Sequence, residues 1–535
     1  MLKRKKILWV SLGIAIVFEI GTLAFRQWTD SSPSDHPIYK AVVPKDASNA
    51  FDDEYVKVRE AERIDDPLQR CLAYPSLPEF NWDPKVVDAF CRLAVRKVIG
   101  WDEFSSAVSD HRTDVLEQIF ASYLNKTYEP GQHGFLCWAF KQLFESSAQP
   151  KERYRILQAW IDADPHSAFA LAARGTYYVR AAWDARGNKF VGDTPHKNFV
   201  RMREFIDKAR VDFDESLKRN PRLIASYHGL LQIARLTSDR DLLAKSVEGA
   251  FALDRADHSI YSDWMVSVEP KWGGSLEAMT AVATKAQEYA DENPLLQRLR
   301  AEPICYEAEM MYCAKCKRRA GTDETALNLL RNAAAFGPAT CFLNEAPRTA
   351  ERVGDSESAA RFYSQAYRFL GGNNNVLRRA QSLSYLKRGE WGRESIAMIL
   401  KSQPRNAEAL AYRGWLEQSE HKLQDAEKSF LAVLVIDPSN REATAELVNL
   451  YTNELHEKGK AEQIVERLMS ENPSNARAWL LKAALQKGGD ESQCKEALKK
   501  YLSLVDDDPD DAYEQRDIAR AKARLVELGK GAIAP

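Results

Sequence analysis

The stretch AEALAYRGWLEQSEHKLQDAEKSFLAVLVIDP, residues 407–438, decides the fold of this chain. It fits a two-helix unit of about 34 residues, with Gly414, Ala426, Phe430 and Pro438 at the eighth, twentieth, twenty-fourth and thirty-second positions. The small residues let the two helices approach closely, the aromatic ring fills the neighbouring gap, and the proline ends the second helix. Because such a pair buries its apolar face only against neighbouring pairs, one good match predicts an array.

This spacing resembles the tetratricopeptide repeat, and it can be followed along the chain by the residues that close each second helix. The closing positions are Pro165, Pro221, Arg255, Pro294, Pro338, Gly371, Pro404, Pro438, Pro473 and Pro509. From Pro338 onward the intervals are 33 to 36 residues, whereas 56 residues separate Pro165 from Pro221. We therefore expect an all-α, tetratricopeptide-like helical solenoid with an insertion of about 22 residues around 186–198.

Segments of the body differ in how closely they follow this spacing. Asp83 and Pro84 begin an early helix as its cap and first-turn proline, but residues 51–145 show no repeat, so we expect an irregular helical N-terminal cap. Residues 146–338 are expected to form an irregular tetratricopeptide-like domain, and residues 339–509 regular repeats. The charged segment 510–535 is expected to form a C-terminal cap helix and tail that solvates the end of the array.

The first fifty residues predict a membrane anchor. Lys3, Arg4, Lys5 and Lys6 precede the run 7–25, in which Glu19 is the single charged residue. As a helix this run spans about 28 Å, which is one bilayer crossing. We interpret 1–6 as a cytoplasmic basic tail, 7–25 as an uncleaved transmembrane helix and 26–50 as a Ser/Pro-rich tether. A cleaved signal peptide is the competing interpretation.

Charge and motifs exclude several classes of function. Lys plus Arg number 75 and Asp plus Glu 77, so no overall field favours nucleic acid as a partner. The sequence contains no GxxxxGK[ST], GxGxxG or GxSxG motif, and His456-Glu457 lacks the second histidine of a zinc-protease helix. The nine histidines form no close pair along the sequence. We therefore predict no catalytic residue, no cofactor and no metal.

The cysteines are compatible with more than one chemistry. Cys313 and Cys316, with Cys305 before them and Cys341 after them, have a spacing that suits zinc, and the adjacent Lys and Arg residues suit a redox pair. We favour structural disulfides or buried thiols, because the chain has an even total of eight cysteines and is expected to be exported. The candidate disulfides are Cys71 with Cys91 and Cys305 with either Cys313 or Cys316.

Two stretches, HSAFALAARGTYYVRAAWDARG at 166–187 and EPKWGGSLEAM at 269–279, resemble a bacterial membrane-anchored tetratricopeptide-like family of unknown function. The matching pattern is Arg174-Gly175, Trp183, Arg186-Gly187 and Trp272-Gly273-Gly274. The resemblance covers roughly residues 100–340 and implies a bacterial origin and a helical-repeat fold. Because that family has no established activity, the resemblance implies no catalytic residue.

The inner face of the regular repeats is the predicted binding site. Inward positions belong mainly to the first helix of each pair, and counted from Ala407 they are Glu408, Ala411, Tyr412, Trp415 and Ser419, with Asn449 and Arg477 equivalent downstream. Aromatic and arginine side chains are frequent anchors of peptide binding. The candidate peptide groove therefore consists of Glu408, Tyr412, Trp415, Asn449 and Arg477.

Two functions are compatible with these features. The first is a membrane-anchored scaffold for protein–protein interaction in the bacterial cell envelope, held in the inner membrane by residues 7–25 with its bulk in the periplasm. Its partner would be an unknown protein or peptide, and the repeats could also stack into homo-oligomers. The alternative is an enzyme, such as a hydrolase of envelope polymers, with a site in residues 51–300. An enzyme predicts clustered acidic or histidine side chains near the insertion after Arg186 and the Trp272 turn.

Overall fold

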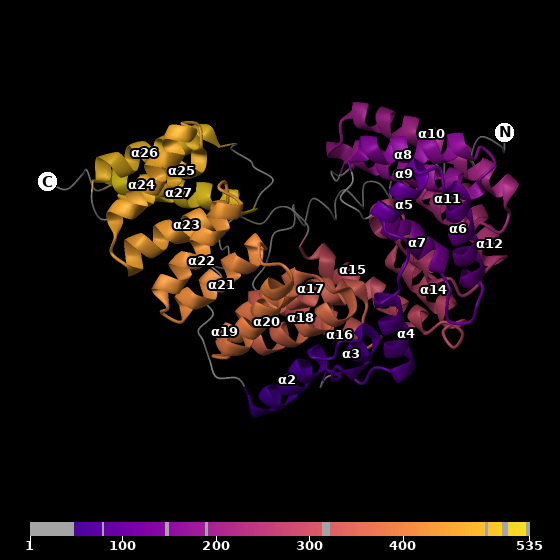
Figure 1. Cartoon of the computed structure of the whole chain (residues 1–535), viewed down its shortest axis with the longest axis horizontal. Helices are drawn as coiled ribbons and strands as arrows, with labels where there is room; N and C mark the ends of the chain where they lie inside the picture. Colours follow the sequence, from indigo (N-terminus) through magenta and orange to yellow (C-terminus); the bar gives the residue numbers. More distant parts are fainter. Residues whose placement is uncertain are drawn as a thin grey trace, which may run out of the picture. The chain divides into compact units, whose positions relative to one another are not determined.

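The computed structural model describes residues 48–77, 80–144, 149–187, 191–312, 321–486, 490–505 and 512–530 (Figure 1). Every regular element in these ranges is helical, which confirms the all-α, tetratricopeptide-like solenoid. The helices fall into two compact units: the N-terminal unit, 52–371, and the C-terminal unit, from 372 onward, with which residues 48–51 are also grouped.

The N-terminal unit opens with helices that precede the repeats. Asp66 and Asp83 set the starts of two of them, because each accepts a hydrogen bond from a backbone N–H of the first turn and is followed by a proline. These helices are α2 (Asn49–Glu62), α3 (Pro67–Ala73), α4 (Pro84–Ala94), α5 (Trp101–Ser109), α6 (Thr113–Thr127), α7 (Phe135–Phe144) and α8 (Pro150–Ala163).

Helix pairs follow at the predicted spacing. The first helices of the pairs are α9 (Ala168–Arg186), α11 (Ile224–Thr237), α13 (His258–Ser267), α15 (Glu302–Met310) and α17 (Thr340–Val353). The second helices are α10 (His196–Arg219), α12 (Arg240–Phe251), α14 (Leu276–Gln287), α16 (Thr322–Ala334) and α18 (Ser356–Leu370). Short 3-10 helices lie at Val191–Asp193 (η1), Pro270–Trp272 (η2) and Pro294–Arg300 (η3). Pro221, Arg255, Pro294 and Pro338 lie between successive pairs, and Pro165 lies between α8 and α9, just before the first pair.

The extra residues between Pro165 and Pro221 mainly lengthen two helices. Helix α9 has 19 residues and α10 has 24, whereas α17 and α18 have 14 and 15. Gly187 follows α9 with a φ of +74°, a conformation that glycine adopts without strain. The insertion expected around 186–198 is therefore largely helical extension on both sides of a short connection.

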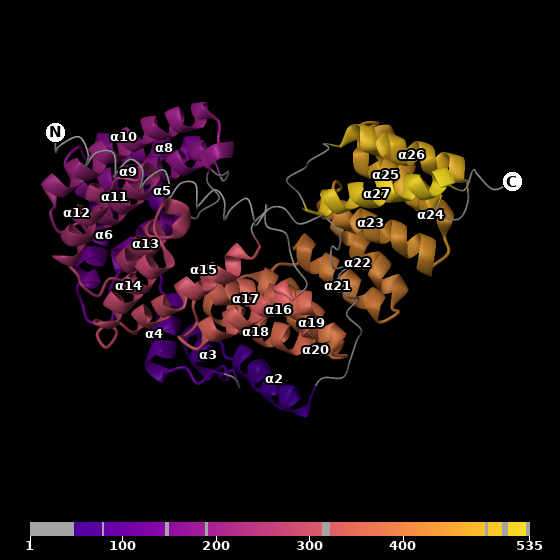
Figure 2. The ribbon, with the colours of Figure 1, turned by 180° about the vertical axis from the view of Figure 1, so that it is seen from behind.

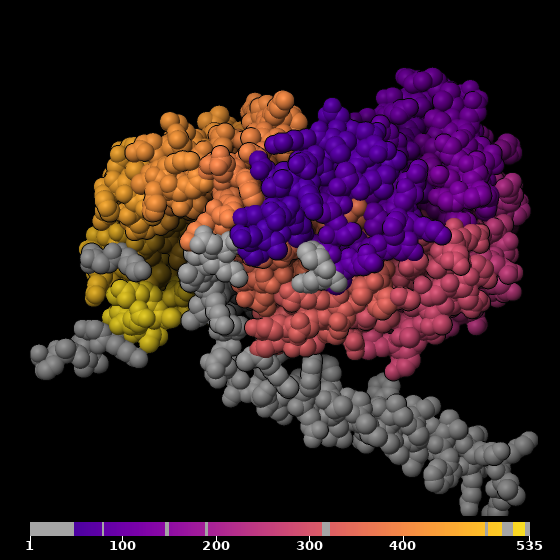
Figure 3. Space-filling model, turned by 90° about the horizontal axis from the view of Figure 1, so that it is seen from below, coloured from indigo at the N-terminus to yellow at the C-terminus, as the bar shows by residue number. Residues whose placement is uncertain are grey.

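Helices α2–α4 pack on the later repeats of the N-terminal unit, although they come first in the sequence. Trp82 Nε1 donates to the carbonyl oxygen of Ala334 over 2.7 Å, and Arg361 of α18 binds Glu54 of α2 at 2.8 Å. Figure 3 shows the indigo N-terminal helices lying against the salmon-coloured repeats. Helices α5–α7 instead pack on one another and on α8, α9 and α11. The stretch 51–145 thus contributes to two separate places in the unit.

The C-terminal unit repeats the helix-pair arrangement. Its first helices are α19 (Asn373–Tyr385), α21 (Ala407–Ser419), α23 (Arg441–Asn449) and α25 (Ala476–Leu485). Its second helices are α20 (Gly389–Ser402), α22 (Leu423–Ile436), α24 (Lys458–Glu471) and α26 (Glu491–Leu504), followed by α27 (Ala512–Lys530). A π-helical turn, Leu450–Glu454, extends α23. Asn406, Asn440 and Asn475 begin three first helices, since each side chain accepts a backbone N–H three residues further on.

A glycine–phenylalanine contact of the same kind joins neighbouring helices within each unit. A Cβ on Gly414 of α21 would lie 2.8 Å from the Phe430 ring of α22, so glycine is what allows the two helices to meet. In the N-terminal unit the Phe213 ring lies against Gly175 and Gly229, where a Cβ would come within 2.8 Å and 2.1 Å of ring carbons. These buried rings are the repeated packing element of the solenoid.

First helices line the inner side of each unit. In the N-terminal unit α9, α11 and α13 contact one another in succession, as α19, α21, α23 and α25 do in the C-terminal unit (Figure 2). Contacts between successive second helices are weaker. Because closer packing on one side curves a row of helix pairs, the first helices lie on the concave side of each unit.

Two disulfides connect helices of the N-terminal unit. Cys71 of α3 is bonded to Cys91 of α4, the pair that the sequence suggested. Cys305 of α15 is bonded to Cys341 of α17, which corrects the expected pairing of Cys305 with Cys313 or Cys316. The physical reason is that α15 and α17 are successive first helices in contact, so residues far apart in sequence meet there. A four-thiolate zinc site is excluded while Cys305 and Cys341 are bonded to each other.

Part of the cysteine cluster and the predicted anchor lie outside the described residues. This applies to Cys313, Cys316, the run 7–25 and most of the tether at 26–50. Among the helices that the structure describes, none is both long and apolar enough to span a bilayer.

Candidate functional site

The predicted groove residues of the C-terminal unit are only partly brought together. Trp415 of α21 packs edge-to-face on Tyr385 of α19, with ring centroids 5.8 Å apart. Glu408 and Asn449 are exposed on their helices. Arg477 of α25 binds Asp517 of α27 at 2.5 Å, so its guanidinium is already engaged by the terminal helix.

A second aromatic pair lies in the N-terminal unit. Trp183 near the end of α9 meets Trp272 at the end of η2, with centroids 5.4 Å apart and ring planes 82° apart. The guanidinium of Arg235 on α11 lies over Trp183 at 5.2 Å, and that of Arg186 lies over Trp272 at 5.3 Å. The two stretches that carried the family resemblance therefore meet in space, which their separation in sequence did not reveal.

Two glycines and an arginine fix the backbone of the Trp272 turn. Gly273 has a φ of +79°, and a Cβ on Gly274 would lie 1.8 Å from the carbonyl oxygen of Val268. Glycine at 274 is thus required by a close backbone approach. Arg240 of α12 donates to the carbonyl oxygens of Trp272 and Gly273 at 3.2 and 2.8 Å, which holds the turn against the neighbouring repeat.

A charged network continues from Trp183 along the inner side. His228, Gln232 and Arg235 lie on one face of α11, because they are spaced by four and three residues. Asp263 of α13 binds all three side chains, at 2.8, 3.0 and 3.3 Å respectively. The side chains of His228 and Asp263 keep 24% and 15% of their exposure, so solvent and a partner can reach them. We call Trp183, Trp272, His228, Arg235 and Asp263 the inner-face cluster.

The pKa values of His228 and Asp263 are shifted because the two side chains attract each other. Burial lowers the pKa of His228, but the carboxylate of Asp263 outweighs burial and raises that pKa above its usual value. Burial acts to raise the pKa of Asp263, yet His228 and Arg235 bring it well below its usual range. His228 and Asp263 therefore stabilise each other's charged forms.

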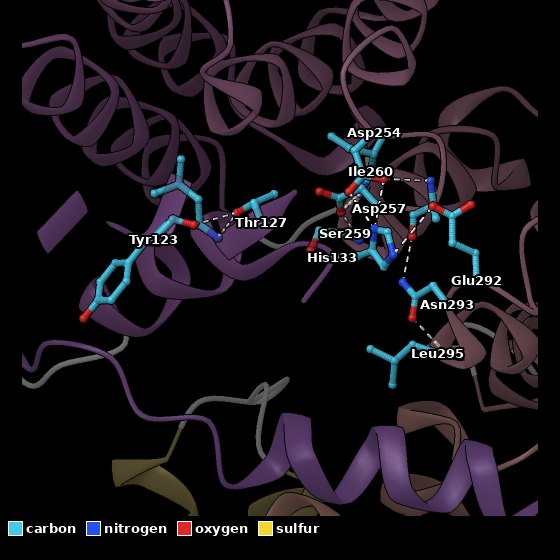
Figure 4. A network of polar contacts seen from close by, with 12 residues as sticks. Tyr123, Thr127, His133, Asp254, Asp257, Ser259, Ile260, Glu292, Asn293 and Leu295 are labelled. Carbon is cyan, nitrogen blue, oxygen red and sulfur yellow. Dashed lines mark hydrogen bonds and ion pairs between the residues drawn. The ribbon is translucent and has the colours of Figure 1, made fainter. Parts of the chain in front are cut away.

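A separate buried network joins three turns of the N-terminal unit (Figure 4). His133, between α6 and α7, places Nδ1 3.0 Å from both carboxylate oxygens of Asp254, which follows α12. Asp254 also accepts the backbone N–H of Ala256, whose carbonyl oxygen accepts a hydrogen bond from Asn293 Nδ2 at 2.7 Å. Both His133 and Asp254 are buried. The network fastens α6–α7 and the turn before η3 to the start of α13.

The start of α13 carries further buried titratable groups. Asp257 caps the helix by accepting the backbone N–H groups of Ser259 and Ile260. Burial, with the nearby Asp254 carboxylate, raises the pKa of Asp257 to about 6. Burial lowers the pKa of the adjacent His258, and a Cβ on Gly134 would lie 2.7 Å from that imidazole. The histidines are far apart in the sequence, so their spacing did not predict that they lie close together. The high density of Asp and His in 254–263 could have indicated this site.

A buried cysteine lies in the same unit. Cys137 of α7 is buried, and burial raises the pKa of its thiol, so it remains protonated and weakly nucleophilic. Within the described ranges, no three His, Cys, Asp or Glu side chains are grouped to hold a metal ion. What the inner-face cluster offers is two indole rings, cations stacked on them, and a partly exposed ion pair.

Residues 103–255 match the family described as a domain of unknown function, DUF4034. The match includes the stretch 166–187 and ends before 269–279. No curated protein matches the sequence.

Solved structures of helical repeats are similar at low sequence identity. A tetratricopeptide repeat protein from Parabacteroides merdae is 16% identical with a TM-score of 0.35, and the alignment covers 53% of this chain and 98% of that one. Yeast Tom70 is 11% identical with a TM-score of 0.31, over 80% of this chain and 95% of that one. The assignment of the fold rests on the helix pairs themselves.

Proposed function

We propose that this protein is a scaffold that binds a protein or peptide partner on the concave side of its N-terminal unit. The observation that carries the proposal is the inner-face cluster, in which Trp183, Trp272 and Arg235 meet beside the partly exposed pair His228–Asp263. Tryptophan and arginine are the side chains most enriched at energetically dominant interface positions. A curved row of first helices offers such side chains to an extended or helical segment.

The proposal includes membrane anchoring and export. Residues 7–25 have the length and composition of one bilayer crossing, and the basic residues before them favour a cytoplasmic N-terminus. Two disulfides in the N-terminal unit support an oxidising compartment, such as the periplasm of a bacterium. An anchored scaffold would raise the local concentration of its partner at the inner membrane.

The partner test compares the inner faces of the two units. Crosslinking in membranes followed by mass spectrometry would be run on the full chain, on Trp183→Ala and on Trp415→Ala. We expect the main partner to be lost with Trp183→Ala and kept with Trp415→Ala, because Trp415 belongs to the other unit. The reverse result would assign the partner to the C-terminal unit. Retention of all partners by both variants, with unchanged circular dichroism, would contradict the proposal.

Topology has its own test. Reporter proteins that are active only inside or only outside the cytoplasm would be fused after Pro535. We expect activity from the outside reporter alone. Activity from the inside reporter alone would contradict export, and would also leave the two disulfides without an oxidising compartment.

A second candidate is an enzyme, because the His228–Asp263 pair is partly exposed. The pair is also connected to the Trp272 turn, since Asp263 binds Arg235 and the guanidinium of Arg235 lies over Trp183. A hydrolase of envelope polymers would release soluble fragments from purified peptidoglycan. The expected result for a scaffold is no release by the full chain. Release that disappears with His228→Gln would instead support the enzyme.

A further inference from the structure

A pocket lies away from the inner-face cluster, where α3, α4 and α18 all end. Its volume is about 210 Å³. Arg70, Tyr74 and Val95 line one part of it, and Arg368 and Phe369 line another. This pocket is independent of the proposed scaffold function, because its lining belongs to other helices.

Arg368 brings a positive charge to the pocket that no acidic side chain offsets. It is 8% exposed, and its Nε donates to the carbonyl oxygen of Cys71 at 2.7 Å while Nη1 donates to Gln365 at 3.1 Å. Among the described residues, no carboxylate lies within ion-pairing distance of Arg368, and its Nη2 donates no hydrogen bond. The rings of Phe369 and Tyr74 lie 4.6 and 5.7 Å from the guanidinium.

Arg70 adds a second guanidinium with unused donors. Its Nη2 donates to the backbone carbonyl of Asp65 at 2.8 Å. Its Nε is buried and has no hydrogen-bond partner. A buried donor without a partner costs about 1–3 kcal/mol, so a bound acceptor in the pocket would relieve an existing penalty.

Helix capping accounts for part of this arrangement. The ends of α3, α4 and α18 each carry roughly half a negative charge, and Arg368 caps α3 by binding the Cys71 carbonyl. Capping uses one of the five N–H groups of a guanidinium, however. Two full positive charges therefore meet about one and a half negative charges from helix ends, and several donors remain.

We propose that this pocket binds a carboxylate carried on a small apolar or aromatic group. The spare N–H groups of Arg70 and Arg368 match the paired oxygens of a carboxylate, and the aromatic walls receive its apolar part. Pockets for drug-sized ligands measure about 300–1,000 Å³, so a pocket of this size admits roughly one ring with its carboxylate. The carboxylate can come from a free organic acid or from the C-terminus of a peptide.

The test uses calorimetric titration of the full chain with phenylacetate and with the uncharged phenylacetamide. We expect phenylacetate to bind and phenylacetamide to bind at least tenfold more weakly. Arg70→Gln is expected to weaken phenylacetate binding at least tenfold, because it removes the charge and the forked donors. Arg92→Gln is the matched control, since Arg92 is an exposed α4 residue paired with Asp88 outside the pocket. Absence of phenylacetate binding, or equal losses in the two variants, would overturn the proposal.

A second pair of probes distinguishes the sources of the carboxylate. N-acetyl-Gly-Phe with a free C-terminus would be compared with its C-terminal amide on the same protein. Tighter binding of the free peptide than of phenylacetate would assign the site to peptide C-termini. Binding of phenylacetate alone would assign it to free organic acids. Equal binding of acid and amide forms in both pairs would show that the charge is not recognised, and would overturn the proposal.

Discussion

At the residue scale, the fold depends on positions where any side chain would collide with a ring. A Cβ on Gly229 would lie 2.1 Å from Phe213, and one on Gly414 would lie 2.8 Å from Phe430. We therefore expect Gly229→Ala to destabilise by about 1–3 kcal/mol, and more than Gly414→Ala, because overpacking grows with the overlap. Gly459→Ala is the control, as nothing lies near its Cβ position. Calorimetric melting of the three variants would measure this, and equal melting temperatures would contradict the packing described.

Asp257 predicts a pH dependence at the same scale. Its pKa is raised from 3.8 to about 6 in the folded protein, so the folded state binds more protons than the unfolded state between these values. Stability contributed by the protonated group is therefore present below pH 3.8 and is lost as pH rises towards 6, by at most roughly 3 kcal/mol. Asp257→Asn keeps an acceptor for the helix cap but cannot ionise. Denaturant unfolding from pH 4 to 7 should show a smaller decline for this variant, and identical declines would contradict the raised pKa.

At the element scale, the ends of helices could be predicted from the sequence, whereas contacts between residues far apart in the sequence could not. Proline, glycine and N-cap residues act within one turn, so helix ends near Pro221 and Pro438 followed from the sequence. The hydrogen bond from Trp82 to Ala334 joins residues 252 positions apart, and no local pattern encodes it. The inner-face cluster was half predicted: the Trp183 and Trp272 stretches were recognised, but their contact, with Arg235 between repeats, needs the tertiary arrangement.

The disulfides give a prediction for the connections between helices. Cys305 and Cys341 enclose a longer stretch, 36 residues, than Cys71 and Cys91, 20 residues. In the chain-entropy account, a longer closed loop stabilises slightly more, and each bond contributes about 2–4 kcal/mol. We expect the double variant Cys305→Ser/Cys341→Ser to lower the melting temperature at least as much as Cys71→Ser/Cys91→Ser. Peptide mapping of the unreduced chain checks the pairing, and a peptide joining Cys305 to Cys313 or Cys316 would contradict it.

At the scale of the whole molecule, the helices fall into two compact units. The boundary falls at Gly371 and Gly372, which both have positive φ, at +69° and +84°. The buried clusters around Phe213, Phe342 and Tyr261 use residues of the N-terminal unit, whereas those around Phe430 and Tyr501 use residues of the C-terminal unit. A unit with its own core can fold alone.

We therefore expect a fragment of residues 372–535 to be helical by circular dichroism and to melt cooperatively, at the temperature of one transition of the full chain. A fragment starting at residue 407 is the control, because it lacks α19 and α20 and exposes the side of α21 that they cover. It should melt at a lower temperature; a fragment 372–535 without helical signal would show that the second unit depends on the first.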